Sequence, residues 1–221
     1  MPPNATYLFK HALVQDTAYA SLLKTRRQAL HRQIAEALRD PFAPLADAEP
    51  EIIAHHFTQA GMAEEAVEWW AKAGELALRR SAYVEAVSHY DKAIGQAEQL
   101  RESPQSLRRR LRLQIACGQA LISARGHGAP ETTAAFTRAR ELAAAIDDPA
   151  ERFSVYYGLW AGSYYRGEHD TMAAIAEIML REIESHPDRP ESVVAYRVVG
   201  TTWWSGGDYV RGREIEKQWR R

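Results

Sequence analysis

The chain has 221 residues, a formal net charge of −1, 46% hydrophobic residues and 26% charged residues, the profile of a globular protein. The near-neutral charge gives no electrostatic reason to expect binding to nucleic acid or to an anionic membrane. The single cysteine, Cys117, excludes an intrachain disulfide framework. No apolar run approaches the roughly 20 residues of a membrane-spanning helix, and no secretory signal opens the chain, so we expect a soluble, cytoplasmic protein without a membrane partner.

The N-terminal region is expected to consist of residues 1–40 and a linker. Residues 7–23 read YLFKHALVQDTAYASLL and residues 24–38 read KTRRQALHRQIAEAL, each with apolar residues at helical spacing. Residues 41–50 then carry three prolines, which interrupt a helical pattern. The sequence therefore predicts a boundary here, with helical repeats over residues 51–221.

The central stretch from Ala73 to Leu100 has the clearest pattern. Ala86, Tyr90 and Ala93 follow the spacing A-x3-F-x2-A, and Tyr83 stands three residues before the first of them. Small residues at this spacing let a neighbouring helix come close, and the aromatic residue fills the groove that this leaves. A helix of this kind cannot bury its apolar face alone, so the pattern predicts neighbours on both sides.

The same triplet occurs one helix earlier, at Ala66, Trp70 and Ala73. The interval between Ala66 and Ala86 is 86 − 66 = 20 residues, whereas the most common helical repeats of this type recur after about 34 residues. We therefore expect the two consecutive helices to share a register without an intact repeat inserted between them.

Two further hairpins are expected downstream. Residues 104–124 and 131–146 form the first, with Phe136 at the aromatic position of its second helix. The loop between them, RGHGAP, is longer than usual and is a candidate functional loop, in which Arg125 and His127 are candidate partner contacts. Residues 150–166 and 169–184 form the second.

The last unit follows the pattern W-x2-L-G-x2-Y in the form Tyr196-x2-Val199-Gly200-x2-Trp203. Its expected core and turn positions are Gly200, Trp203, Gly207 and Tyr209. Helical-repeat arrays usually end in a polar capping helix, and no such helix follows here. We therefore expect the repeats to be truncated at the C-terminus.

These motifs resemble two families. Residues 51–221 resemble tetratricopeptide repeats. The segments YLFKHALVQDTAYASLL, RRQALHRQIAEAL, PEIIAHHFTQAG and AVEWWAKAGELALRRSAYVEAVSHY together resemble the part that follows the ATPase core in bacterial multidomain signal-transduction ATPases. That family often carries a class III adenylate/guanylate cyclase domain, then an ATPase, a winged helix and a helical-repeat sensor. The resemblance implies an all-α, tetratricopeptide-like α-solenoid of antiparallel helix hairpins, preceded by a short helical winged-helix remnant.

The catalytic motifs of that family have no counterpart here. The chain has no phosphate-binding G-x-x-x-x-G-K-[ST] sequence, and no acidic pair of the kind that a cyclase uses to hold metal ions. We therefore expect no catalytic residue, no cofactor and no enzymatic activity in this chain. An ATPase or cyclase activity would belong to a parent protein.

His11 is the candidate nucleotide-sensing residue. In FKHALVQD it stands where related signalling ATPases carry a Met-His-Asp motif, whose histidine reaches toward the phosphates of the bound nucleotide. The resemblance implies this role for His11 only in a full-length protein, and Ala12 replaces the aspartate of the motif. The alternative is an ordinary histidine at a strand–helix junction.

Two other polar groups are expected to be structural. His55 and His56, with His31 or His89, could suggest a metal site, but adjacent helical residues point about 100° apart, and no carboxylate or cysteine completes a ligand set. We therefore expect packing histidines and no metal. A basic run, made of Arg108, Arg109, Arg110 and Arg112, is expected to be a solvated helix face that does not bind nucleic acid directly.

The tryptophans are divided by their place in the repeats. Trp70 and Trp203 stand at repeat-core positions. Trp69 and Trp204 are adjacent to core residues, so we expect them to face outward and to be partner contacts.

The sequence favours a non-catalytic sensor module of a signalling ATPase or cyclase-linked regulator, which binds a protein or peptide on its repeat surface. An upstream nucleotide-binding ATPase domain of the same parent is a second expected partner. Two alternatives remain open: a fragment of an ATP-binding cyclase-type enzyme, or a fragment of a DNA-binding transcriptional regulator whose other domains are absent.

Overall fold

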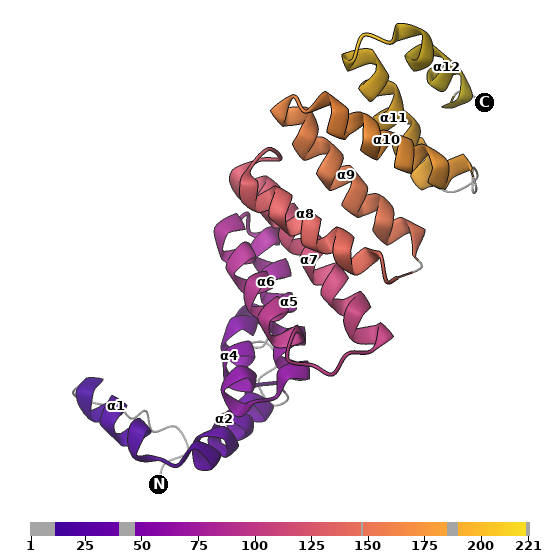
Figure 1. The fold of residues 1–221 in the computed structure, drawn as a ribbon. Coiled ribbons are helices and arrows are strands. Elements are labelled where there is room, and N and C mark those ends of the chain that lie inside the picture. Colours follow the sequence, from indigo (N-terminus) through magenta and orange to yellow (C-terminus); the bar gives the residue numbers. More distant parts are fainter. Residues whose placement is uncertain (1–11, 40–46, 147, 185–189, 220–221) are drawn as a thin grey trace.

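The computed structural model describes residues 12–39, 47–146, 148–184 and 190–219, and the regular secondary structure of these ranges is α-helical. The helices are α1 (Ala12–Ser21), α2 (Lys24–Arg39), α4 (Pro50–Ala60), α5 (Ala63–Arg79), α6 (Tyr83–Ala97), α7 (Pro104–Arg125), α8 (Pro130–Ala143), α9 (Pro149–Arg166), α10 (His169–Glu184), α11 (Glu191–Ser205) and α12 (Tyr209–Trp219). Figure 1 shows them stacked into an elongated array, with α1 projecting from its N-terminal end. The predicted all-α solenoid is confirmed.

Local sequence explains where many helices begin and end. Helices α4, α7, α8 and α9 have a proline at or next to their first position, where the missing N–H costs no hydrogen bond. Ser103 and Ser106 form a capping box at the start of α7, and Asp148 accepts two backbone hydrogen bonds at the start of α9. Gly61 and Gly167 end α4 and α9 in the left-handed conformation that glycine adopts easily.

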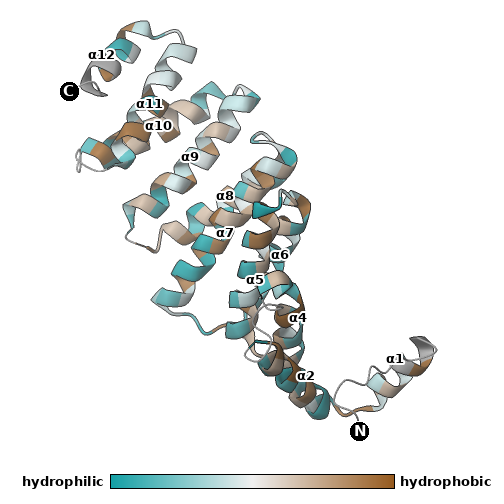
Figure 2. Cartoon of the chain, turned by 180° about the vertical axis from the view of Figure 1, so that it is seen from behind, coloured by the Kyte–Doolittle hydropathy of each residue, from teal (hydrophilic) through white to brown (hydrophobic). Residues whose placement is uncertain are grey.

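Helices that are consecutive in the sequence pack against each other. From α4 onward each helix contacts the next, which makes hairpins of α5/α6, α7/α8, α9/α10 and α11/α12, and α2 packs against α4. The buried apolar residues form two clusters, one reaching from α2 to α8 and the other from α7 to α12. Figure 2 shows hydrophobic and hydrophilic positions on each central helix, as expected where one face lies in the core.

In the middle of the array, aromatic rings lie directly over glycines. A Cβ atom added at Gly74 in α5 would lie 2.8 Å from the ring of Tyr90 in α6. The ring of Phe136 in α8 lies between Gly118 in α7 and Gly158 in α9, where added Cβ atoms would come within 2.9 Å and 2.4 Å of it. Only glycine leaves room for these rings, so each ring can pack here only because the helix that it faces carries a glycine.

The two helices that carry the small–aromatic–small triplets, α5 and α6, pack against each other. These helices make one hairpin, in which Tyr90 covers Gly74, so the 20-residue interval separates the two helices of a single repeat. The six residues of the two triplets are all buried: Ala66, Trp70, Ala73, Ala86, Tyr90 and Ala93.

Several residues that we expected in the repeat core lie at its margin. Tyr83 and Tyr209 are the first residues of α6 and α12, and are 36% and 57% exposed because a first turn extends past the neighbouring helix. Gly207 lies in the exposed turn before α12 with φ +84°. Trp203 is only half-buried, and the guanidinium of Arg211 lies 5.1 Å from the centre of its ring.

The N-terminal region is described only in part. His11 lies outside the described residues, as does most of the expected linker, of which Pro50 begins α4. Tyr19 joins α1 to α2, because its hydroxyl is 2.9 Å from Nε2 of His31 and its ring lies 5.1 Å from the guanidinium of Arg27. The division at residues 41–50 stays a prediction.

Candidate functional site

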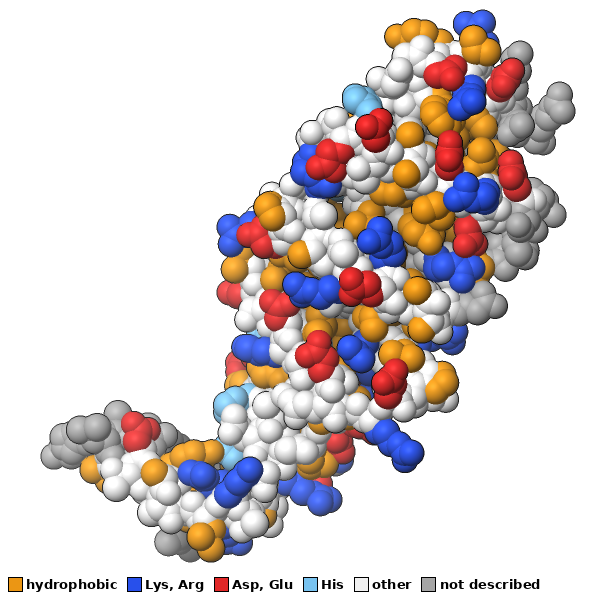
Figure 3. All heavy atoms as spheres, in the orientation of Figure 1, with side chains coloured by type: hydrophobic (Ala, Val, Ile, Leu, Met, Phe, Trp, Pro, Cys, Tyr) orange, Lys and Arg blue, Asp and Glu red, His pale blue; other side chains and the backbone are white. Residues whose placement is uncertain are grey.

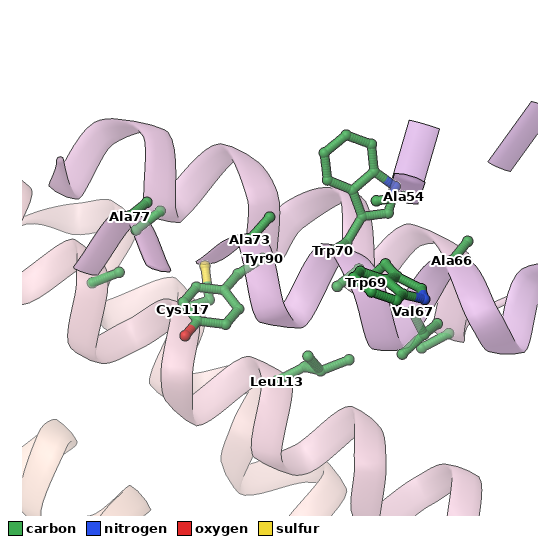
Figure 4. Packing of buried hydrophobic residues seen from close by; sticks show 14 of the residues in the cluster. Ala54, Ala66, Val67, Trp69, Trp70, Ala73, Ala77, Tyr90, Leu113 and Cys117 are labelled. Atoms are coloured by element: carbon green, nitrogen blue, oxygen red, sulfur yellow. The ribbon is translucent and has the colours of Figure 1, made fainter. Parts of the chain in front are cut away.

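Trp69 is not a surface residue, and the expectation that it faces outward is wrong. Its side chain is 7% exposed and belongs to the N-terminal core cluster together with Leu113 of α7. Trp70 is buried as well, and its indole N–H donates to Oγ1 of Thr58 at 2.9 Å. Figure 4 shows the two rings on different sides of α5. Both rings are buried in a core cluster that reaches from α2 to α8, so Trp69 has a packing role.

The loop between α7 and α8 is fastened to α9. The ring of His127 stacks on Tyr165 with a centroid distance of 4.9 Å, and Oγ1 of Thr132 donates to the carbonyl oxygen of Gly126 at 2.9 Å. His127 is half-buried, so it helps to hold the loop in place. Arg125 is exposed, and none of the described residues forms an ion pair or hydrogen bond with it. A partner contact at this loop stays a prediction.

Trp204 lines an apolar groove at the C-terminal end of the array. The ring is 47% exposed, lies over Gly212 and meets Tyr209 edge-on at 5.2 Å. The groove has a volume of about 620 Å³, and Val193, Val194 and Gly200 contribute to its lining. Gly200, an expected core position, is only half-buried and lies at the edge of this groove. The role of Trp204 as a partner contact stays a prediction.

A second groove of about 630 Å³ lies between α5, the first turns of α7 and the turn that follows α8. Three arginines line it, Arg108, Arg109 and Arg112, and all three are exposed. Nε of Arg112 is 2.6 Å from Oε1 of Glu151 at the start of α9. The sequence indicated the arginines but not Glu151, because 39 residues separate it from Arg112.

Three histidines meet where α2 packs against α4. Nδ1 of His31 lies 2.8 Å from Nδ1 of His56, and the centre of the His55 ring is 6.1 Å from that of His31. Burial lowers the pKa of both His31 and His56, and the neighbouring imidazoles lower it further, with Arg27 adding to the effect at His31. His31 and His56 therefore favour the neutral form more strongly than an imidazole in water does.

Cys117 is a buried free thiol. Burial, together with the nearby carboxylate of Asp91, raises the pKa of Cys117 to about 12, so this thiol stays protonated at neutral pH. No cluster of three or more histidine, cysteine, aspartate or glutamate residues within the described ranges has the geometry of a metal site. Among the same residues, no helix combines the length and the apolar character needed to cross a membrane.

Comparisons with solved structures place the fold. The chain is similar to BtubC from P. vanneervenii, with a TM-score of 0.60, 13% identity and coverage of 96% of this chain and 91% of that one. It is also similar to a Podospora anserina putative kinesin light chain with tetratricopeptide-like repeats, with a TM-score of 0.58, 13% identity and coverage of 89% and 94%. The MamA protein matches with a TM-score of 0.52, 16% identity and coverage of 87% and 89%. The fold is therefore a tetratricopeptide-like α-solenoid.

Sequence comparisons are less informative. No family model matches the chain. It is 28% identical over 221 residues to an uncharacterized protein of Rhizobium meliloti (strain 1021), a match that covers 99% of this chain and 21% of the relative. The chain thus spans about a fifth of the length of this relative.

Proposed function

We propose that this chain is a non-catalytic protein-interaction module that holds a protein or peptide partner on its repeat surface. One observation carries the proposal: the array of helix hairpins leaves two grooves of about 630 Å³ and 620 Å³ open between its helices. Grooves of this size accept several side chains of a bound segment. A tetratricopeptide-like fold fits such a role, because residues from several hairpins can contact one partner together.

The finer proposal is that the module is the sensor segment of a signalling ATPase or cyclase-linked regulator. It rests on the sequence resemblance of residues 7–100. In this setting an ATPase domain of the same parent would be a second partner, and His11 would approach its nucleotide. The activity of the parent would lie outside this chain.

A peptide-display selection on the immobilised chain tests the proposal. Enriched peptides are synthesised and titrated by calorimetry, with a display of unrelated sequences as the control. We expect saturable binding with one peptide per chain and no ATP turnover above buffer. The proposal fails if no enriched peptide binds saturably while circular dichroism shows the chain to be folded, or if ATP turnover persists after repurification.

A further inference from the structure

The groove between α5 and α7 combines an apolar floor with a basic rim. Leu113, Ile146 and Tyr90 line it and are 6%, 8% and 3% exposed, so the floor consists of core side chains. Leu107 and Ala116 add further apolar surface. A bound segment would therefore bury apolar side chains here, which is the main source of affinity in such grooves.

Three arginines stand on one rim, within the first three turns of α7. Arg108 and Arg112 are four residues apart and so lie on the same face of the helix, and Arg109 lies beside them. No ion pair or hydrogen bond joins Arg109 to any described residue. A guanidinium carries five N–H donors, so most of the donors on this rim are not used within the described part of the chain. Figure 3 shows Lys and Arg side chains over the central helices of one face.

Glu151 shows how a carboxylate binds to this rim. Its Oε1 pairs with Nε of Arg112 at 2.6 Å, but its Oε2 is 3.8 Å from Nε of Arg108, beyond hydrogen-bonding distance. This second oxygen is buried, and it has no hydrogen-bond partner among the described residues. A single carboxylate thus serves two arginines incompletely, and it leaves Arg109 free to pair with another.

We infer that this groove binds an acidic peptide segment of a protein partner, whose carboxylates pair with Arg108 and Arg109 while its apolar side chains cover the floor. The inference rests on the proposed function and names the chemistry of the partner. Charge complementarity favours carboxylates, since arginine forks match them in geometry. A nucleic acid fits less well, because the aromatic residue of the groove, Tyr90, is 3% exposed and too buried for a base to stack on.

Fluorescence anisotropy with three labelled peptides of equal length tests the inference. The peptides alternate leucine with glutamate, glutamine or lysine. We expect the glutamate peptide to bind at least about tenfold more tightly than the glutamine peptide, with an affinity that falls as salt rises. The lysine peptide should not bind.

Variants locate the site. Arg109→Glu should weaken binding of the glutamate peptide about tenfold or more, whereas Arg140→Glu should not. Arg140 is an exposed residue of α8 whose side chain makes no ion pair or hydrogen bond in the described part of the chain. Glu151→Gln should strengthen binding severalfold, because it removes the carboxylate that competes for Arg112. Circular dichroism verifies that each variant is folded.

The outcomes separate the two proposals. Equal binding of the glutamate and glutamine peptides, or binding that Arg109→Glu does not change, would overturn the acidic-peptide inference and leave the interaction module standing. Displacement of the glutamate peptide by single-stranded RNA, with tighter binding of the RNA, would also overturn it. If no peptide of any charge binds, either here or in the display selection, the proposed function itself fails.

Discussion

The middle of the array and its C-terminal end use the same glycine position in different ways. In the middle, Phe136 covers both Gly118 and Gly158 so closely that no Cβ would fit. At the end, Gly200 holds the equivalent place in α11, and the nearest side-chain atom to an added Cβ is Cγ2 of Ile215, at 3.8 Å. The glycine of the first helix is therefore not enough to close a hairpin. Whether the glycine lies in the core or at the edge of a groove depends on whether an aromatic ring of a neighbouring helix covers it.

A hydrogen bond from a tryptophan indole to a threonine hydroxyl links helices near each end of the array. Trp70 in α5 donates its indole N–H to Thr58 in α4 at 2.9 Å, and Trp160 in α9 donates to Thr202 in α11 at 2.8 Å. The second bond is buried, whereas the first is partly accessible. The N-terminal end differs further, because a contact between histidines joins α2 to α4 there.

The largest change in the free energy of unfolding is expected from removing the ring of Phe136, which packs between α7 and α9. Phe136→Ala should lower the free energy of unfolding by about 3–5 kcal/mol, because the ring is 2% exposed and fills the space between two glycines. Urea titration followed by circular dichroism measures the change. A loss below about 1 kcal/mol would mean that α7, α8 and α9 are not held together by this ring.

A pair of glycine substitutions tests the comparison directly. Gly158→Ala should destabilise the chain by about 1–3 kcal/mol, since its Cβ would lie 2.4 Å from a ring that Gly118 hems in on the other side. Gly200→Ala should be neutral or should stabilise it by about 0.5–1 kcal/mol, because alanine favours the helix and the space is open. The same urea titration compares them, and equal losses would contradict the difference between middle and end.

The buried hydrogen bond from Trp160 to Thr202 can be removed by replacing the threonine with valine, which has nearly the same shape. Thr202→Val should cost about 1–3 kcal/mol, because it leaves the indole N–H of Trp160 buried and unpaired. Thr58→Val, at the partly accessible site, should cost less because water can replace the hydroxyl. Thermal melts of the two variants give the ranking, and a larger loss for Thr58→Val would reverse the expected order.

The smallest effect is a local response to pH at the histidine contact. The pKa values of His31 and His56 in the folded chain are lower than the usual value of 6.5, so the unfolded state binds more protons between the two values. The stability of the α2–α4 contact is therefore present above about pH 6.5 and is lost as the pH falls below it.

Hydrogen exchange at about pH 7.5 and about pH 5.5, corrected for intrinsic rates, should show α2 and α4 losing protection while α7 and α8 keep it. His56→Gln should flatten this dependence, and His169→Gln, at an exposed position of α10, should not. A uniform loss of protection along the whole array would argue against a local effect.

The sequence by itself determined the helices, their order and the pairing within the α7/α8 and α9/α10 hairpins. Prolines, capping residues such as Ser103 and left-handed glycines act locally, so they can be recognised without knowing the neighbours. The small–aromatic–small triplet around Tyr90 also predicted burial of its own helix face, because the helical period alone places its three members together.

Only the tertiary structure decided which flanks are covered and which charges meet. Trp69 is buried in a core cluster built from several helices, and Glu151 reaches Arg112 across 39 residues of sequence. The contact between His31 and His56 spans 25 residues in the same way. A helical pattern specifies the direction of a side chain, but the helix that this side chain meets depends on the angle at which distant segments pack. The candidate grooves were therefore not predictable, although the arginines and Trp204 that line them were named from the sequence.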